Sequence, residues 1–120
     1  MTDDPMSAVR EELDAIRRNF GMQLETQVGK IVGAWQAAEK GRGGSEAYCE
    51  VRDLTHSLAG NAGVLGFMEV SREAAALEEM LDQALEAGQH DAVDLQLRID
   101  AAMGHLVGVA AESASPDEAI

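Results

Sequence analysis

Apolar residues recur every three or four positions along most of the chain, and this spacing constrains the fold more than any other feature of the sequence. Residues spaced in this way share one face of an α-helix, so the pattern predicts a series of amphipathic helices. The clearest stripe, between residues 20 and 40, consists of Phe20, Leu24, Val28, Ile31, Trp35 and Ala38. Aromatic residues make up only 3% of the chain and proline occurs twice, which favours a bundle of helices over a β-sheet.

We therefore expect an all-α fold, an up-down-up-down antiparallel four-helix bundle with an additional short N-terminal helix. The additional helix spans about Asp4 to Arg18, with Asp4 as N-cap and Pro5 as first helical residue, and we expect it to lie as a lid across one end of the bundle. The bundle helices are expected at residues 20–40, 45–62, 67–87 and 91–109. The 120 residues suffice for a single domain, which we assign to residues 1–112, and we expect the polar residues 113–120 to form a flexible tail.

Charge and composition argue against several classes of partner and location. Nine basic residues stand against 22 acidic ones, and the net charge of −13 argues against DNA, RNA or an anionic membrane surface. The N-terminus lacks the apolar stretch of a signal peptide, and no apolar run approaches the ~18 residues of a membrane span. A single cysteine leaves no internal disulfide and no paired-cysteine metal motif. These features predict a soluble cytoplasmic protein without a metal or another cofactor of its own.

His56 is the candidate functional residue. It lies on the polar face of the helix expected at residues 45–62, opposite the apolar residues Val51, Leu54, Leu58 and Ala62. Its neighbours on the polar side are basic or small: Arg52 one turn before, and Ala59, Gly60 and Gly63 in the two turns after. Glycine within a helix costs about 1 kcal/mol relative to alanine, so the presence of glycine at position 60 calls for an explanation. We interpret it as access, because a bulky side chain at position 60 would cover His56 against an approaching partner.

An exposed imidazole is suited to act as a nucleophile on its own. It is mostly neutral at pH 7 and has one ring nitrogen free to attack. Phosphoryl transfer asks little of such an acceptor beyond in-line positioning, since the metal and the stabilising charge can come from the partner. Neither His90 nor His105 has the neighbouring ligands of a metal site, and residues 40–45 lack the order of a phosphate-binding loop. The alternative is that His56 is an ordinary solvated surface residue.

A strip of small or apolar residues lines the outer side of the helix at residues 20–40, and it includes Met22, Thr26, Gly29 and Gly33. Either the short N-terminal helix packs closely on this strip, or a partner protein docks there. A second outward pair, Gly104 and Gly108, lies on the last helix. It indicates close packing or simple tolerance of glycine, or alternatively a homodimer contact.

Two motifs resemble those of a known family. The segment His56-Ser57-Leu58-Ala59-Gly60, followed by Gly63-Val64-Leu65-Gly66-Phe67, and the later segment at 70–78 are similar to the histidine-containing phosphotransfer (HPt) domains of bacterial two-component phosphorelays. The likeness extends from about residue 10 to residue 109. It implies that His56 is phosphorylated, taking a phosphoryl group from the aspartate of one response-regulator receiver domain and passing it to another. It also implies a monomer without an ATP site or autokinase activity, Mg²⁺ on the partner receiver domain, and a hybrid histidine kinase as a further candidate partner.

One position departs from the family pattern. The family commonly has a lysine three residues after the histidine, where its charge can steady the phosphoryl group, and this chain has Ala59 there. We hypothesise that Arg52 supplies the cation instead.

The sequence leaves two other interpretations open. The phosphotransfer module of a sensor kinase fits less well, because Ser57 stands where that family usually has an acidic residue and 120 residues leave no room for an ATP-binding domain. The other interpretation, from a different functional class, is a non-catalytic acidic helical adaptor in which His56 is incidental.

Overall fold

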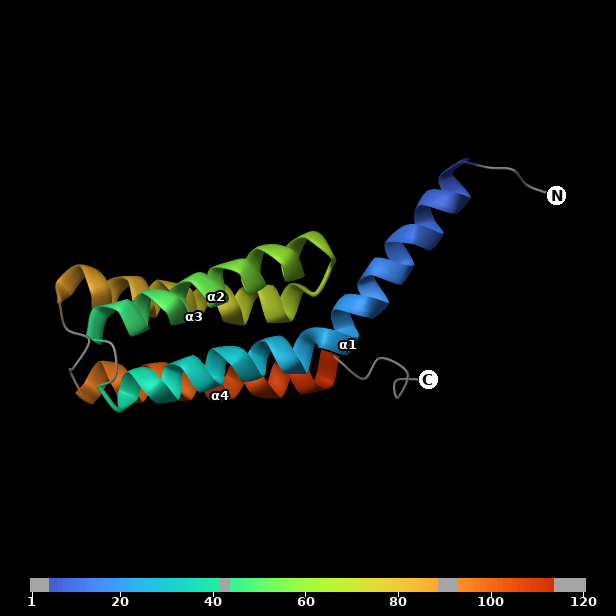
Figure 1. The fold of residues 1–120 in the computed structure, drawn as a ribbon. Helices are drawn as coiled ribbons and strands as arrows, with labels where there is room; N and C mark the ends of the chain where they lie inside the picture. Colours follow the sequence, from blue (N-terminus) through green and yellow to red (C-terminus); the bar gives the residue numbers. More distant parts are fainter. Residues whose placement is uncertain (1–4, 42–43, 89–92, 114–120) are drawn as a thin grey trace.

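The computed structural model describes residues 5–41, 44–88 and 93–113, which contain four α-helices and no β-strand (Figure 1). The helices are α1 (Pro5–Glu39), α2 (Gly44–Val64), α3 (Met68–Ala87) and α4 (Val93–Ser113). The last three match the helices predicted at residues 45–62, 67–87 and 91–109 to within a few residues. The predicted cap Asp4, the first two residues of the helix predicted at 91–109, and residues 114–120 of the predicted tail lie outside the described residues.

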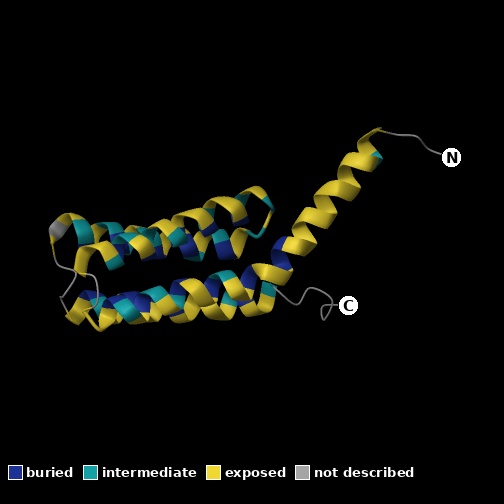
Figure 2. Ribbon diagram, in the orientation of Figure 1, coloured by how far each residue is buried: buried dark blue, intermediate teal, exposed yellow. Residues whose placement is uncertain are grey.

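The four helices lie side by side as an antiparallel bundle. Each helix packs on the next along the chain and α4 also packs on α1, so the helices close a ring around one core (Figure 1). Figure 2 shows the buried positions on the inner sides of the helices. The largest fully buried side chains come from the predicted stripes: Trp35, Leu24, Ile31, Leu58, Leu77, Leu81, Ile99 and Leu106. Because burial of apolar surface is the main favourable term in folding, these stripes fix which face of each helix points inward.

The predicted break between a short N-terminal helix and the first bundle helix is wrong, because α1 runs without interruption through Arg18 and Phe20. No proline lies in this stretch, and a single glycine, Gly21, costs a helix only about 1 kcal/mol. Residues 5–19, which we name the N-terminal arm, therefore continue the helix beyond the bundle instead of lying across it as a lid (Figure 1). Every arm residue is exposed except the half-buried Ser7 (Figure 2).

The turn between α2 and α3 holds the base of the arm. Gly66 has a φ of 90°, a left-handed conformation that glycine adopts without strain, and the chain reverses there. The Phe67 ring lies against the Phe20 ring with centroids 5.0 Å apart, and Arg17 Nε donates a hydrogen bond to the Leu65 carbonyl at 3.1 Å. The core therefore ends at Phe20, and the arm begins directly beyond it.

Candidate functional site

α2 presents His56 to solvent because its neighbours on the inner face are anchored in the core. Thr55 is fully buried and donates its hydroxyl to the Val51 carbonyl at 2.7 Å, and Leu58 is buried as well. The His56 side chain is 74% exposed. The outward orientation predicted from the helical spacing agrees with this position.

A carboxylate from α3 holds one nitrogen of the imidazole. His56 Nδ1 lies 2.7 Å from Oε2 of Glu78, whose side chain is only 22% exposed. Because a carboxylate can only accept hydrogen bonds, the proton of a neutral imidazole resides on Nδ1, and the lone pair resides on Nε2. Among the described residues, Glu78 is the one hydrogen-bond partner of this ring.

Arg52 lies one turn before His56, as predicted, but two carboxylates bind its guanidinium. The distances are 3.2 Å to Asp53 Oδ1 and 3.5 Å to Asp82 Oδ1 on α3. The hydrogen bond to Asp53, followed by the charges of Asp53 and other neighbours, raises the pKa of Arg52 above its ordinary value. The cation is therefore close to the candidate site, and acidic side chains hold it in the free protein.

The surface after His56 is open. Gly60 is exposed, and a Cβ placed on it would meet no atom within 4 Å. Ala59 is partly buried against the core, and its carbonyl accepts a hydrogen bond of 2.9 Å from the Ser71 hydroxyl. Gly63 has a different environment: a Cβ there would lie 3.1 Å from Ser71 Oγ. The small residue at Gly63 thus permits close approach of α3, whereas the one at Gly60 leaves space beside the imidazole.

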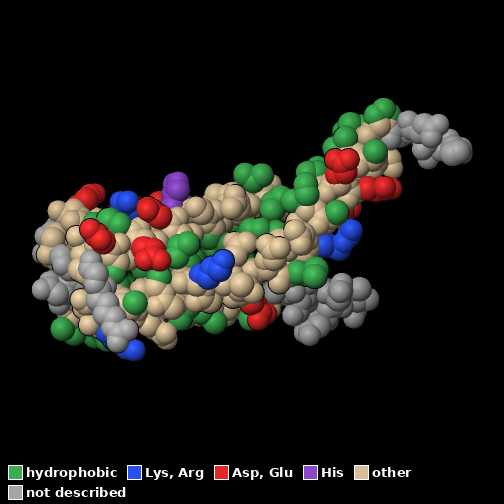
Figure 3. Space-filling model, viewed as in Figure 1, with side chains coloured by type: hydrophobic (Ala, Val, Ile, Leu, Met, Phe, Trp, Pro, Cys, Tyr) green, Lys and Arg blue, Asp and Glu red, His purple; other side chains and the backbone are tan. Residues whose placement is uncertain are grey.

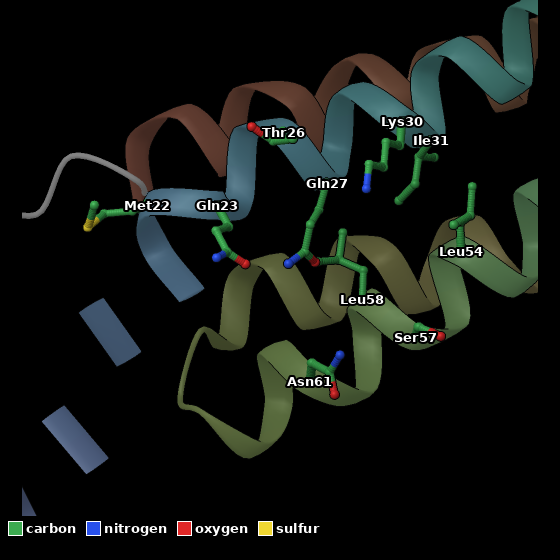
Figure 4. Close-up of a pocket in the computed structure, with 10 residues that line it drawn as sticks. All are labelled: Met22, Gln23, Thr26, Gln27, Lys30, Ile31, Leu54, Ser57, Leu58 and Asn61. Carbon is green, nitrogen blue, oxygen red and sulfur yellow. The ribbon is translucent and has the colours of Figure 1, made fainter. Parts of the chain in front are cut away.

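The residues of the outer strip predicted on α1 line two different grooves. The first, of about 600 Å³, lies between α1 and α2 and brings Met22, Thr26 and Lys30 together with Ser57 and Asn61 (Figure 4). Lys30 extends into the space between the two helices in this view. Since Ser57 directly follows His56, this groove adjoins the candidate site.

The second groove, of about 350 Å³, lies between α1 and α4, and Gly29, Gly33 and Val107 line it. Because α1 lies between α2 and α4 in the ring of helices, this groove is separated from the His56 surface. No short N-terminal helix packs on the strip, as the arm extends past the bundle. Gly104 and Gly108 are also exposed, with no atom within 4 Å of a built Cβ, so they do not mark close packing within the described chain.

Sequence reasoning assigned no role to Glu78 or Asp82, the two acidic side chains of α3 beside the site. They are four residues apart and therefore share one face of α3. That spacing was visible in the sequence, but their pairing with His56 and Arg52 depends on the register between α2 and α3. The turn at Gly66 and the close contact at Gly63 set that register.

The described residues contain no group of three His, Cys, Asp or Glu side chains placed to hold a metal ion. His105 is exposed on α4, and His90 lies outside the described residues. Within the same residues, none of the helices combines the length and apolar character that crossing a membrane requires.

The comparisons with known proteins identify the class. The described residues form a small all-helical bundle with the exposed imidazole of His56 on the α2–α3 hairpin. The model of the Hpt domain family matches residues 6–108, and the chain belongs to this family. Hpt domains are phosphocarriers rather than kinases; they act in histidine phosphotransfer and interact with receiver domains in phosphorelays. Comparison with curated proteins and with solved structures gave no significant match.

Proposed function

We propose that this protein is a phosphorelay intermediate in which His56 accepts a phosphoryl group from the phospho-aspartate of one receiver domain and passes it to another. The observation that carries the proposal is the contact between His56 Nδ1 and Glu78 Oε2 at 2.7 Å on a side chain that is 74% exposed. This contact leaves Nε2 with the lone pair, on an open surface beside Gly60. The nitrogen that becomes phosphorylated is therefore Nε2.

The transfer step balances without a further reactant. Nε2 attacks the phosphorus of the acyl phosphate, the N–P bond forms, and the P–O bond to the receiver aspartate breaks, leaving that aspartate as a carboxylate. The imidazole then carries a positive charge with its proton still on Nδ1, and the Glu78 carboxylate balances that charge. Transfer to the second receiver is the same step in reverse.

Charge stabilisation in the transition state comes from two sources. A receiver domain that holds Mg²⁺ would supply positive charge to the transferring phosphoryl group. Arg52 is the cation of this chain closest in sequence to the site, and it would exchange Asp82, at 3.5 Å, for the phosphoryl oxygens. This exchange compensates for Ala59 at the position where the family commonly has a lysine.

The receiver domain docks over the hairpin surface around His56 and extends into the α1–α2 groove. Met22, which is 79% exposed, and Thr26 line this groove from α1, and Ser57 lines it from α2. An apolar contact flanked by polar groups fits the usual composition of a transient interface. Gly29 and Gly33, on the α1–α4 side, do not contribute to this surface. We assign the protein to the cytoplasm, where we expect its receiver partners.

The test is label transfer from a phosphorylated receiver domain to the purified protein, beside a His56→Gln variant. Acid-labile, base-stable label on the wild type and none on the variant is the expected result, and NMR of the phosphorylated imidazole should place the phosphorus on Nε2. Absence of label with every receiver tested would favour the adaptor interpretation. Label that persists in His56→Gln would show that another residue is the acceptor.

A further inference from the structure

The N-terminal arm has an apolar stripe that the bundle leaves open. Val9, Leu13 and Ile16 are 46%, 40% and 50% exposed, although all three lie on the helix face that is buried farther along α1. Figure 3 shows hydrophobic side chains gathered along the arm with acidic and basic groups beside them. Helices of about 15 residues are marginal in water on their own, so an exposed arm of this length gains stability when its stripe is covered.

The spacing of the stripe is that of a helix pair. From Met6 through Val9, Leu13 and Ile16 to Phe20 the steps are three, four, three and four, which is the repeat of a coiled-coil seam. Phe67 already covers Phe20 within the same chain. The open part of the seam is therefore the part that projects beyond the bundle.

We propose that the arm is a self-association surface, through which two copies of this chain pair arm to arm in antiparallel orientation. This inference goes beyond phosphotransfer and differs from the monomer that the family resemblance implied.

Charge favours a second copy as the occupant of this surface. The whole chain has a net charge of −13, so two copies repel each other over most of their surfaces. The arm is an exception: it contains three arginines (Arg10, Arg17 and Arg18) and three acidic residues (Glu11, Glu12 and Asp14), and its net charge is zero. Two arms can therefore meet without net repulsion, while the acidic bundles remain apart.

The geometry at the base of the arm fixes the orientation. The α2–α3 turn lies against α1 at Phe20 and closes the stripe at that end (Figure 1). A parallel partner helix would continue past Phe20 into this turn. An antiparallel partner ends there and places its own bundle at the far end of the arm, so each bundle keeps His56 accessible.

The size of the interface sets the concentration range. An arm of 15 residues is about 22 Å long, and a contact of that length is smaller than a standard interface between stable partners. We therefore expect a weak dimer that forms between about 1 μM and 1 mM.

The test is sedimentation velocity of the full chain over this range, with two variants that introduce the same charge. Leu13→Glu places a carboxylate in the seam, whereas Ala15→Glu places it on another exposed face of the arm. We expect the wild type and Ala15→Glu to dimerise with rising concentration and Leu13→Glu to stay monomeric with an unchanged thermal midpoint of the bundle. A wild type that is monomeric throughout, or a Leu13→Glu variant that dimerises equally well, would overturn the proposal.

Disulfide trapping tests the orientation in a Cys49→Ser background, which removes the free thiol of this chain. In antiparallel arms a mixture of Met6→Cys and Ile16→Cys should form a mixed disulfide, because the two positions lie at opposite ends of the seam. A disulfide between two copies of Met6→Cys would contradict the antiparallel arrangement.

Discussion

A larger side chain at position 60 should stabilise the protein and slow phosphotransfer, because the space beside Gly60 is open to solvent and directly adjoins His56. Neither Gly60 nor its control Gly104 has a positive φ or an atom within 4 Å of a built Cβ. Replacing either glycine within a helix should therefore stabilise the protein, by up to about 1 kcal/mol for alanine and about half of that for glutamine. For a chain of this size, 1 kcal/mol corresponds to a rise in thermal midpoint of roughly 3–5 °C.

A substitution at position 60 should impair phosphotransfer, whereas the same substitution at position 104 should not. Residues four apart on a helix have Cβ atoms about 5–6 Å from each other, and helical side chains lean toward the N-terminus. A glutamine at position 60 therefore extends over the turn that contains His56. Reacting atoms must approach to about 3–3.5 Å, and a displacement near 1 Å costs up to about 100-fold in rate. We expect Gly60→Gln to slow phosphoryl transfer from a receiver roughly 10- to 100-fold.

The assay combines thermal unfolding with rapid-quench measurement of transfer from a phosphorylated receiver. Gly60→Gln should be more stable and slower than the wild type, whereas Gly104→Gln on α4 should be more stable and equally fast. A Gly60→Gln variant that transfers at the wild-type rate would refute the argument that this glycine provides access. A variant that lost stability would refute the argument that the site is sterically open.

Three further predictions concern the charged groups. Glu78→Ala should slow transfer about five- to tenfold in the same assay, because a charge-assisted hydrogen bond to an exposed group contributes roughly 1 kcal/mol. Glu78→Gln should slow it less, because its amide oxygen still accepts a hydrogen bond from His56 Nδ1. Equal rates for the wild type and both variants would show that Glu78 does not position His56. Arg52→Ala should slow transfer and alter the lifetime of phosphorylated His56, followed as loss of label, and unchanged values of both would eliminate Arg52 as the substitute cation. Partial desolvation, followed by the hydrogen bond and charge of Asp100, raises the pKa of Glu39 above its ordinary 4.5, so its ionisation opposes folding as pH rises through that region. Glu39→Gln should therefore raise the free energy of unfolding at pH 7, by less than about 1 kcal/mol for so exposed a group, and with it the thermal midpoint; the difference should vanish below pH 4.5. A variant less stable at pH 7 would contradict the sign.

The sequence predicted those features that depend on local periodicity. The stripe that includes Leu24, Ile31 and Trp35 is buried, and His56 is exposed, because the side-chain spacing of a helix decides both. The continuity of α1 could not be predicted, since no local signal distinguishes a helix that ends near residue 19 from one that continues. Its amphipathic pattern has the same form whether the apolar face is covered by the bundle or left exposed.

The charge environment of the site could not be predicted for a different reason. The contacts of Glu78 with His56 and of Asp82 with Arg52 join residues 22 and 30 positions apart, on helices whose register is set by a turn. Periodicity places each residue on a face of its own helix but does not align two helices lengthwise. Arg52 was therefore predicted at the correct position, without the carboxylate on α3 that binds it.

The position of His56 near the middle of α2 has a consequence, under the proposed function, for how long a phosphoryl group would stay there. The unpaired amide groups and the positive end of a helix dipole lie in the first turn, and His56 is about three turns beyond the start of α2 at Gly44. A phosphoryl group on Nε2 would receive no help from that helix end. Glu78 lies at Nδ1, on the other side of the ring, and Arg52, which Asp82 binds in the free protein, is the nearby cation for the phosphoryl oxygens. Under the proposed function, such a group would depend mainly on its N–P bond and on one arginine, so a receiver domain that docks would remove it readily. We expect this protein to pass a phosphoryl group on quickly rather than to store it.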